Sequence, residues 1–381
     1  MTKRSMVYML VIVVIILIVT LSLWKKMDEP SENRPVTTTS SPTDSSLTTS
    51  ETAATDAESD STETEVKSLY ELVAEYGDLQ LVDAHNHDAS GFAYSKMQKN
   101  WEHSSVDRIV LFGDVSEPSA IKTDEIAWGA YEEDPERFIP FFSGINLLDE
   151  SGLQTVRDNL EKGYFGIGEI AAASTYSPAL AHVAWKTKDP MDGILPDIYK
   201  LCAEYKVPVL LHIDPPNGAP VFKLEEALEA YPDTTFIFAH INAHNSPYNV
   251  ESLLEKHPNL YADFFAGFTA FNPESAYELE DFVPVIKKFP DRFLLSTDSG
   301  YGLSGGEEKA IEGMYRLIDA LDDRQIAQQV AGGNLEQLIR IQPATKTQLE
   351  ALDAADLSDV EKDLSDLTKE EAGKLLLNYK K

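Results

Sequence analysis

The chain has 381 residues, of which 43% are hydrophobic, and its formal net charge is −32. This charge argues against nucleic-acid binding, because phosphate backbones are met by basic surfaces, and we expect no nucleic-acid partner. The single cysteine, Cys202, excludes an intramolecular disulfide and a metal site built from several thiolates. The length allows one large domain with additional segments.

An apolar run from Met6 to Trp24 lies near the start of the chain. Its nineteen residues, at a rise of about 1.5 Å each, just span a hydrocarbon core of about 30 Å. Basic residues flank both ends, and no small-x-small cleavage site follows. We therefore expect an uncleaved signal anchor over residues 1–27 instead of a removed signal peptide, and a single-pass protein of the cell membrane.

Residues 28–66 are dominated by Ser, Thr, Asp, Glu and Pro. Such a segment buries too little apolar area to offset the entropy of ordering it, so we expect a disordered, acidic stalk. A Ser/Thr-rich stalk behind an N-terminal anchor favours an extracytoplasmic position for the rest of the chain. A linker on the inner face of the membrane is the alternative.

Residues 67–342 alternate short β-rich runs with helix-length segments. Runs such as VPVLL at 207–211 are wholly apolar, which is typical of parallel strands covered on both faces. Eight such units in fewer than 300 residues predict an α/β fold, a (β/α)8 TIM barrel, with a doubly wound open sheet as the alternative. The predicted strands are 79–83, 108–112, 138–145, 166–170, 207–212, 235–240, 260–264 and 293–297.

The acidic tail, residues 343–381, contains two S/T-x-x-E patterns, Ser358 with Glu361 and Thr368 with Glu371. This pattern is typical of a capping box, in which the first side chain and the fourth satisfy each other's backbone N–H. We expect short helices here that pack against the outside of the barrel.

Residues that can bind metal ions end five of the eight predicted strands. In a parallel barrel the carboxyl ends of the strands meet at one face, where active sites lie. Each histidine alone would more often be a packing or surface residue, but the set predicts a metal site. Nitrogen and oxygen ligands without sulfur suit Zn²⁺, Mn²⁺ or another first-row ion. The set comprises His85 and His87 at the first strand, Glu169 at the fourth, His212 at the fifth, His240 at the sixth and Asp298 at the eighth.

Several motifs resemble the amidohydrolase superfamily of metal-dependent TIM barrels, and in particular its amidohydrolase-related branch. The resemblance covers residues 79–342, and the motifs of the first and eighth strands are the most specific. The motifs are VDAHNH at 82–87, DPERFIP at 134–140, GYFGIGE at 163–169, FPDRFLLSTD at 289–298 and GGNLEQL at 332–338.

The resemblance implies a role for each candidate ligand. His85 and His87 would bind one metal, with Asp298 completing its shell. His212 and His240 would bind a second metal; otherwise His212 joins the first metal and His240 polarises the substrate. Glu169 stands where binuclear relatives place a bridging carboxylate, whereas in mononuclear decarboxylases this position is not a ligand. One or two divalent ions per chain are therefore expected, with zinc first.

The expected chemistry is activation of water. A divalent cation lowers the pKa of bound water from its high value in bulk solvent towards about 7. Asp298 would accept the proton of this water, and His240 or the metal would stabilise the oxyanion. We therefore predict a metal-dependent hydrolase of a small ester, amide or lactone. The alternatives are a mononuclear decarboxylase of a small or aromatic carboxylic acid and a catalytically silent surface protein. The sequence does not predict an oligomeric state.

Overall fold

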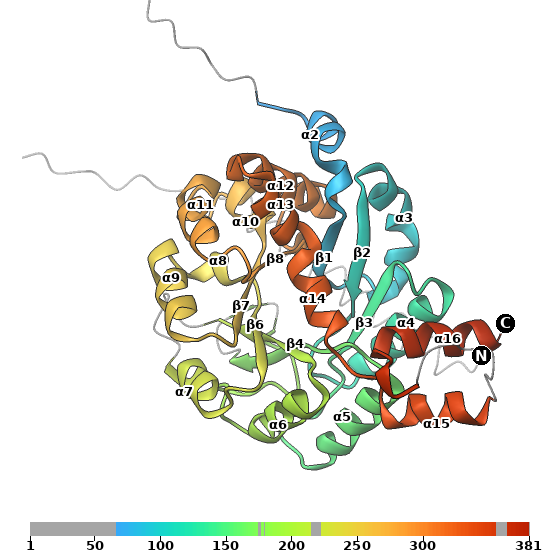
Figure 1. The fold of residues 1–381 in the computed structure, drawn as a ribbon. Helices are drawn as coiled ribbons and strands as arrows, with labels where there is room; N and C mark the ends of the chain where they lie inside the picture. The colour runs from blue at the N-terminus through green and yellow to red at the C-terminus, as the bar shows by residue number, and fades with distance from the viewer. Residues whose placement is uncertain (1–65, 174–176, 179, 215–221, 356–363, 381) are drawn as a thin grey trace, which may run out of the picture. The chain divides into compact units, whose positions relative to one another are not determined.

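The computed structural model describes residues 66–173, 177–178, 180–214, 222–355 and 364–380 (Figure 1). All of them belong to one compact unit, Thr64–Lys381. The predicted anchor, and the predicted stalk up to residue 65, lie outside the described residues.

A search of the described residues finds no helix with the length and apolar character needed to cross a membrane. This finding corrects the prediction of a single-pass membrane location. The apolar run at residues 6–24, on which that prediction rested, lies outside the described part of the chain.

Eight parallel strands form one sheet in chain order, each paired with the next (Figure 1). The last strand lies against the first, so the sheet nearly closes. This arrangement confirms the predicted (β/α)8 TIM barrel and excludes the doubly wound open sheet. The strands are β1 (Leu81–Asn86), β2 (Val106–Leu111), β3 (Phe138–Phe142), β4 (Gly166–Ala173), β5 (Pro208–Ile213), β6 (Thr235–Phe238), β7 (Leu260–Phe264) and β8 (Phe293–Leu295).

Helices surround the strands, as Figure 1 shows. The α-helices are α2 (Leu69–Tyr76), α3 (Tyr94–His103), α4 (Ala120–Glu133), α5 (Ser151–Lys162), α6 (Leu195–Tyr205), α7 (Phe222–Ala230), α8 (Ile241–His244), α9 (Pro247–Lys256), α10 (Ala266–Phe271), α11 (Leu279–Lys288), α12 (Gly306–Leu321), α13 (Arg324–Gln328), α14 (Asn334–Arg340), α15 (Lys346–Ala354) and α16 (Lys369–Lys380). Short turns of other helix types are η1 (Gly77–Leu79), η2 (Ser90–Phe92), η4 (Asp298–Gly300), η5 (Gln329–Gly333) and η6 (Leu364–Asp366).

The strands are apolar because both of their faces are covered. Every residue of β3 and of β5 is buried, as expected for parallel strands that face side chains inside the barrel and helices outside it. Large aromatic side chains fill much of this core; Trp101 and Phe138 are at most 1% exposed and their rings pack edge to face.

Two strands, β1 and β4, continue three residues further towards their carboxyl ends than predicted, and the difference matters for the site. β1 continues through His85 to Asn86, and β4 continues to Ala173, so Glu169 lies inside its strand and not at its end. The pairing register is irregular between Asp83 and Asn86 and between Ile167 and Ile170. Such irregularities turn a side chain away from its regular direction. His85 and Glu169 each lie within one of these irregular stretches.

The tail packs against the side of the barrel, next to the amino-terminal ends of β2, β3 and β4 (Figure 1). Thr368 and Glu371 form the predicted capping box, since each side chain accepts a hydrogen bond from the other residue's backbone N–H. The second predicted box, at 358–361, lies outside the described residues. The buried Lys369 Nζ donates to the carbonyl oxygen of Tyr164, just before β4. The tail therefore packs on the barrel at the opposite end of the strands from the metal-ligand candidates.

The backbones of α10 and α12 approach closely at two glycines. A Cβ on Gly313 would lie 2.6 Å from the Cα of Gly267, whereas a Cβ on Gly129 in α4 would meet nothing within 4 Å. We predict that Gly313→Ala lowers the free energy of unfolding by about 1–3 kcal/mol, as overpacking does. Gly129→Ala should instead raise it by up to about 1 kcal/mol, because alanine favours helix. Thermal unfolding of both variants measures this, and similar stabilisation by both would contradict the close packing.

Candidate metal centre

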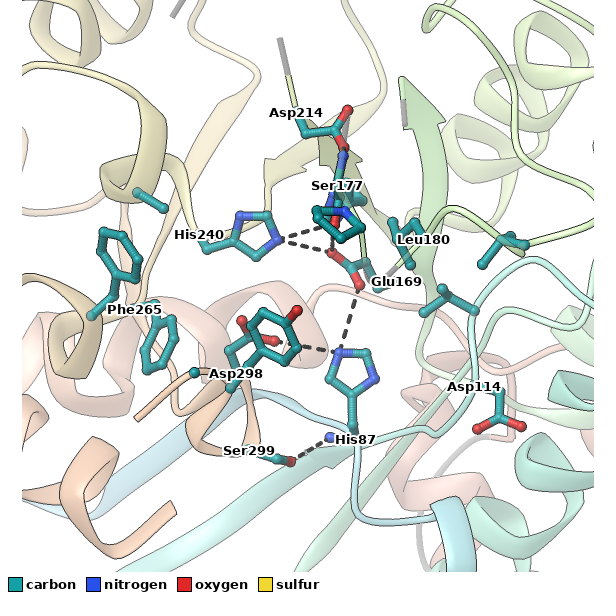
Figure 2. Close-up of a pocket in the computed structure, with 18 of the residues that line it drawn as sticks. His87, Asp114, Glu169, Ser177, Leu180, Asp214, His240, Phe265, Asp298 and Ser299 are labelled. Carbon is teal, nitrogen blue, oxygen red and sulfur yellow. Dashed lines mark hydrogen bonds and ion pairs between the residues drawn. The ribbon is translucent and has the colours of Figure 1, made fainter. Parts of the chain in front are cut away.

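The six candidate ligands gather in two groups at the carboxyl ends of the strands. One group, the first triad, is His85, His87 and Asp298; the other, the second triad, is Glu169, His212 and His240. In each triad the atoms that can bind a metal lie within 4.8 Å of one another. Figure 2 shows His87, Glu169, His240 and Asp298 turned towards a common centre. Their role as ligands stays a prediction.

The first triad presents two imidazole lone pairs to each other. His85 Nε2 and His87 Nε2 are 3.1 Å apart, and Asp298 Oδ1 is 3.5 Å from each. His85 Nδ1 lies 2.7 Å from an Asp263 carboxylate oxygen, and His87 Nδ1 lies 2.7 Å from the Gly113 carbonyl oxygen. Because both partners only accept hydrogen bonds, each Nδ1 carries the proton. The two Nε2 lone pairs therefore repel each other unless a cation or an added proton lies between them.

The second triad is organised around Glu169. Its Oε1 lies 2.8 Å from His212 Nδ1 and 3.2 Å from His240 Nε2, and these two nitrogens are 3.1 Å apart. The other oxygen, Oε2, faces the first triad at 3.6 Å from His87 Nε2 and 3.9 Å from His85 Nε2. One buried carboxylate thus offers one oxygen to each triad.

Asp263 connects the two triads on the side away from the cavity, and the sequence patterns did not predict it. Its Oδ2 accepts hydrogen bonds from His85 Nδ1 at 2.7 Å and from the backbone N–H of His240 at 2.8 Å. A carboxylate on the far nitrogen of a metal-binding histidine sets the tautomer and the ring orientation. One sequence feature could have indicated Asp263: it is the one charged residue in the otherwise uncharged strand LYADF, residues 260–264.

A second buried carboxylate positions Asp298. Asp83 accepts hydrogen bonds from the Thr297 backbone N–H at 2.9 Å and from its hydroxyl at 2.6 Å. This joins the end of β1 to the segment after β8, where the Ser299 hydroxyl also accepts from the His87 N–H (Figure 2). Asp298 and His240 have φ values of 44° and 36°, a left-handed conformation that L-residues rarely adopt and that occurs often at functional sites.

Charges in the site raise the pKa of several histidines. Burial alone would lower the pKa of His85, but the carboxylates of Asp263, Glu169 and Asp298 outweigh it and raise that pKa to about 10. Burial would also lower the pKa of His212. The carboxylates of Glu169 and Asp214 outweigh burial and raise this pKa to about 9. The pKa of Glu169 lies well below its usual range, because the surrounding histidines outweigh its burial.

The donor set fits divalent cations. Each triad combines imidazole nitrogen with carboxylate oxygen and contains no sulfur, as zinc and manganese sites often do. Ligand nitrogens about 2.0–2.1 Å from one tetrahedral zinc ion lie roughly 3.3 Å apart, within a few tenths of an ångström of the 3.1 Å observed in both triads. The facing Nε2 lone pairs of His85 and His87 in the first triad also favour a bound cation, because a cation between them removes their repulsion.

Five of the six triad residues, all except the buried His85, form part of the wall of a cavity of about 1150 Å³. Apolar side chains, including Val115, Leu180, Phe265 and Phe268, cover much of the remaining wall. The cavity is large enough for a small organic molecule to reach the ligand residues.

Comparisons with known proteins agree with this architecture. A family model described as amidohydrolase matches residues 110–341. The search of curated proteins finds no match.

Solved structures that are similar to the chain share little sequence with it. An uncharacterized TIM-barrel protein from Bordetella bronchiseptica is 14% identical, with a TM-score of 0.50, over 68% of this chain and 97% of that chain. A TatD homolog from Escherichia coli is 18% identical (TM-score 0.48; 68% and 98% covered). A dihydroxybenzoic acid decarboxylase from Polaromonas, solved with bound manganese, is 14% identical (TM-score 0.43; 68% and 96% covered). The likeness to the Bordetella protein concerns the fold alone.

Replacing Asp263 tests its role behind both triads. We predict that Asp263→Asn weakens divalent-metal binding by about 10- to 100-fold, because an amide polarises His85 less than a carboxylate does. Competition with a chelating dye measures the affinity. Asp291→Asn, at an exposed position, is the matched control and should bind metal like the unchanged protein. Equal affinities for the two variants would contradict the positioning role.

Metal binding should release protons. In the metal-free protein the pKa values of about 10 for His85 and about 9 for His212 keep both rings protonated at neutral pH, whereas a ligand nitrogen must be unprotonated. We therefore predict that metal affinity rises with pH until the pH passes these values. Calorimetry in buffers of different ionisation enthalpy counts the released protons at neutral pH, and a heat independent of the buffer would contradict the prediction.

Proposed function

The chain belongs to the amidohydrolase family, whose model matches more than half of it, and on that premise we propose that it is a metal-dependent hydrolase of a small, uncharged ester, amide or lactone bond. The observation that carries the proposal is the position of Glu169, with one oxygen towards each triad. This arrangement supports two divalent ions per chain, one in each triad. The nitrogen and oxygen donors favour zinc, with manganese as the next choice.

A bound divalent metal would supply a Lewis acid that makes water a stronger nucleophile and polarises a carbonyl oxygen. In hydrolysis the water oxygen forms the new bond to the carbonyl carbon, the bond to the leaving group breaks, and the leaving group gains a proton. Asp298 is 12% exposed in its side chain, so it lies at the cavity surface where it can accept the proton of the attacking water. It would then pass the proton to the leaving group.

His240 completes the proposed chemistry from the second triad. It lines the cavity, and the Asp263 carboxylate holds its backbone in place. We propose that it binds the second metal, with His212 and Glu169. His240 and a metal held there would supply positive charge that stabilises the oxygen on which negative charge develops, which lowers the barrier.

The charge of the cavity favours hydrolysis over the alternative, decarboxylation of a carboxylic acid. Among the described residues, no lysine or arginine lines the cavity. A substrate carboxylate would therefore find no side chain to pair with in a wall that already contains several carboxylates. An uncharged ester, amide or lactone bond meets no such repulsion.

Two variants test this function. We predict that the zinc- or manganese-loaded protein hydrolyses members of a panel of small esters, amides and lactones, and that Asp298→Asn lowers kcat by at least about 100-fold, the usual range for losing a general base. Glu169→Gln should also abolish most activity, because it removes the carboxylate between the triads. Rates are measured with the metal content of each variant determined in parallel.

The same assay separates the alternatives. Release of CO2 from aromatic acids, with Glu169→Gln still active, would replace the hydrolase by a mononuclear decarboxylase. No turnover of either panel by fully metal-loaded protein would support the catalytically silent protein.

A further inference from the structure

We infer that the substrate carries a positively charged group, such as an ammonium, in addition to the bond that is hydrolysed. The inference rests on the proposed function, because it concerns the same cavity and takes the two triads as its reacting end. It adds the charge class of the substrate, which the metal ligands do not determine.

The cavity wall is rich in carboxylates beyond the two triads. Four lie outside them, and two of these are visible in Figure 2 on different sides of the triad residues. Residues 174–176, 179 and 215–221 adjoin wall residues in the sequence and lie outside the described residues; they include no lysine or arginine. The four carboxylates are Asp114, Glu117, Asp214 and Glu274.

Two of these carboxylates accept hydrogen bonds from uncharged donors; Asp214 also lies 3.7 Å from His212 Nε2, whose ring must be neutral to bind a metal. The Ser177 backbone N–H donates to Asp214 Oδ2 at 2.5 Å, and Asp214 is 4% exposed. Asp114 accepts a hydrogen bond from the Ser90 hydroxyl. Neutral donors stabilise an ionised carboxylate without cancelling its charge. Lys186, on the loop after β4, directs its ammonium to the carbonyl oxygens of Leu180 and Ala181.

The charge balance stays negative even with metals bound. Among the residues that the structure describes, six carboxylates line the cavity. Two divalent ions, with neutral histidines, would cancel four of these charges and leave two. Inside a partly desolvated cavity such charges act more strongly than at a free surface. The cavity should therefore attract a cation and repel an anion.

The triads and an aromatic wall point to a ligand independently of the four carboxylates. The triads provide the reacting end, and Phe265, Phe268 and Tyr301 provide apolar surface beside it. Aromatic faces accept the organic body of a ligand and attract a cation. Together these features suit an organic molecule with a polar bond at the metals and a positive charge towards the carboxylates.

Three inhibitors that share one metal-binding group test the inference. They are benzohydroxamates with an aminomethyl, a hydroxymethyl or a carboxylate group in the para position. Calorimetric titration into the full-length, zinc-loaded protein gives each Kd without depending on turnover. We expect the aminomethyl compound to bind at least about tenfold tighter than the hydroxymethyl compound, and the carboxylate compound to bind weakest. This preference should shrink at high ionic strength.

Variants locate the effect within the cavity. Glu117→Gln with Glu274→Gln removes two wall charges outside the triads and should reduce the preference for the aminomethyl compound several-fold. Asp353→Asn, at an exposed position on α15 in the tail, is the control for net charge and should leave the preference unchanged.

The outcomes separate this inference from the proposed function. Tight binding of all three compounds with equal Kd, or tightest binding of the carboxylate, would overturn the inference and leave the metal-dependent hydrolase standing. Failure of the protein to bind zinc, or of the zinc-loaded protein to bind any hydroxamate, would overturn the proposed function and the inference with it.

Discussion

A single buried carboxylate oxygen determines the geometry of the site. Asp263 Oδ2 accepts from the ring of His85 in the first triad and from the backbone of His240 in the second. The first bond directs the His85 lone pair into the centre, and the second helps to hold His240 in a left-handed conformation that its side chain alone would not favour. Because one oxygen makes both bonds, the two triads cannot shift independently. Glu169 connects them a second time from the cavity side.

The barrel supplies the framework for these contacts, and local irregularities in strand pairing direct the ligand side chains towards the site. Parallel strands bring β1, β4, β5, β6, β7 and β8 to one end of the barrel, where the two triads and Asp263 meet. Pairing irregularities at His85 and at Glu169 turn side chains from within strands towards the centre. The link from Asp83 to Thr297 closes the barrel between β1 and β8 and places Asp298 beside both histidines. The contacts that close the barrel between β1 and β8 therefore also bring the first triad together.

The sequence predicted the barrel and the six candidate ligands because both leave regular patterns. Wholly apolar runs indicate covered parallel strands, and a ligand type near the end of several runs indicates a shared site; the motif resemblance is confirmed by the family match. Asp263 was missed because its partners are far away in the chain, and a single charge in a strand does not reveal them. The position of Glu169 within β4 was also missed, since pairing irregularities depend on the neighbouring strand. The membrane location was inferred from a segment outside the described residues, and the described helices do not support it.

We propose that two divalent ions bind in this site, one held by each triad, with Glu169 offering one oxygen to each triad. The most direct measurement is anomalous X-ray scattering at the zinc absorption edge from crystals of the zinc-loaded protein. Our account predicts two anomalous peaks, one among His85, His87 and Asp298 and the other among Glu169, His212 and His240. A single peak, or peaks away from both triads, would contradict it.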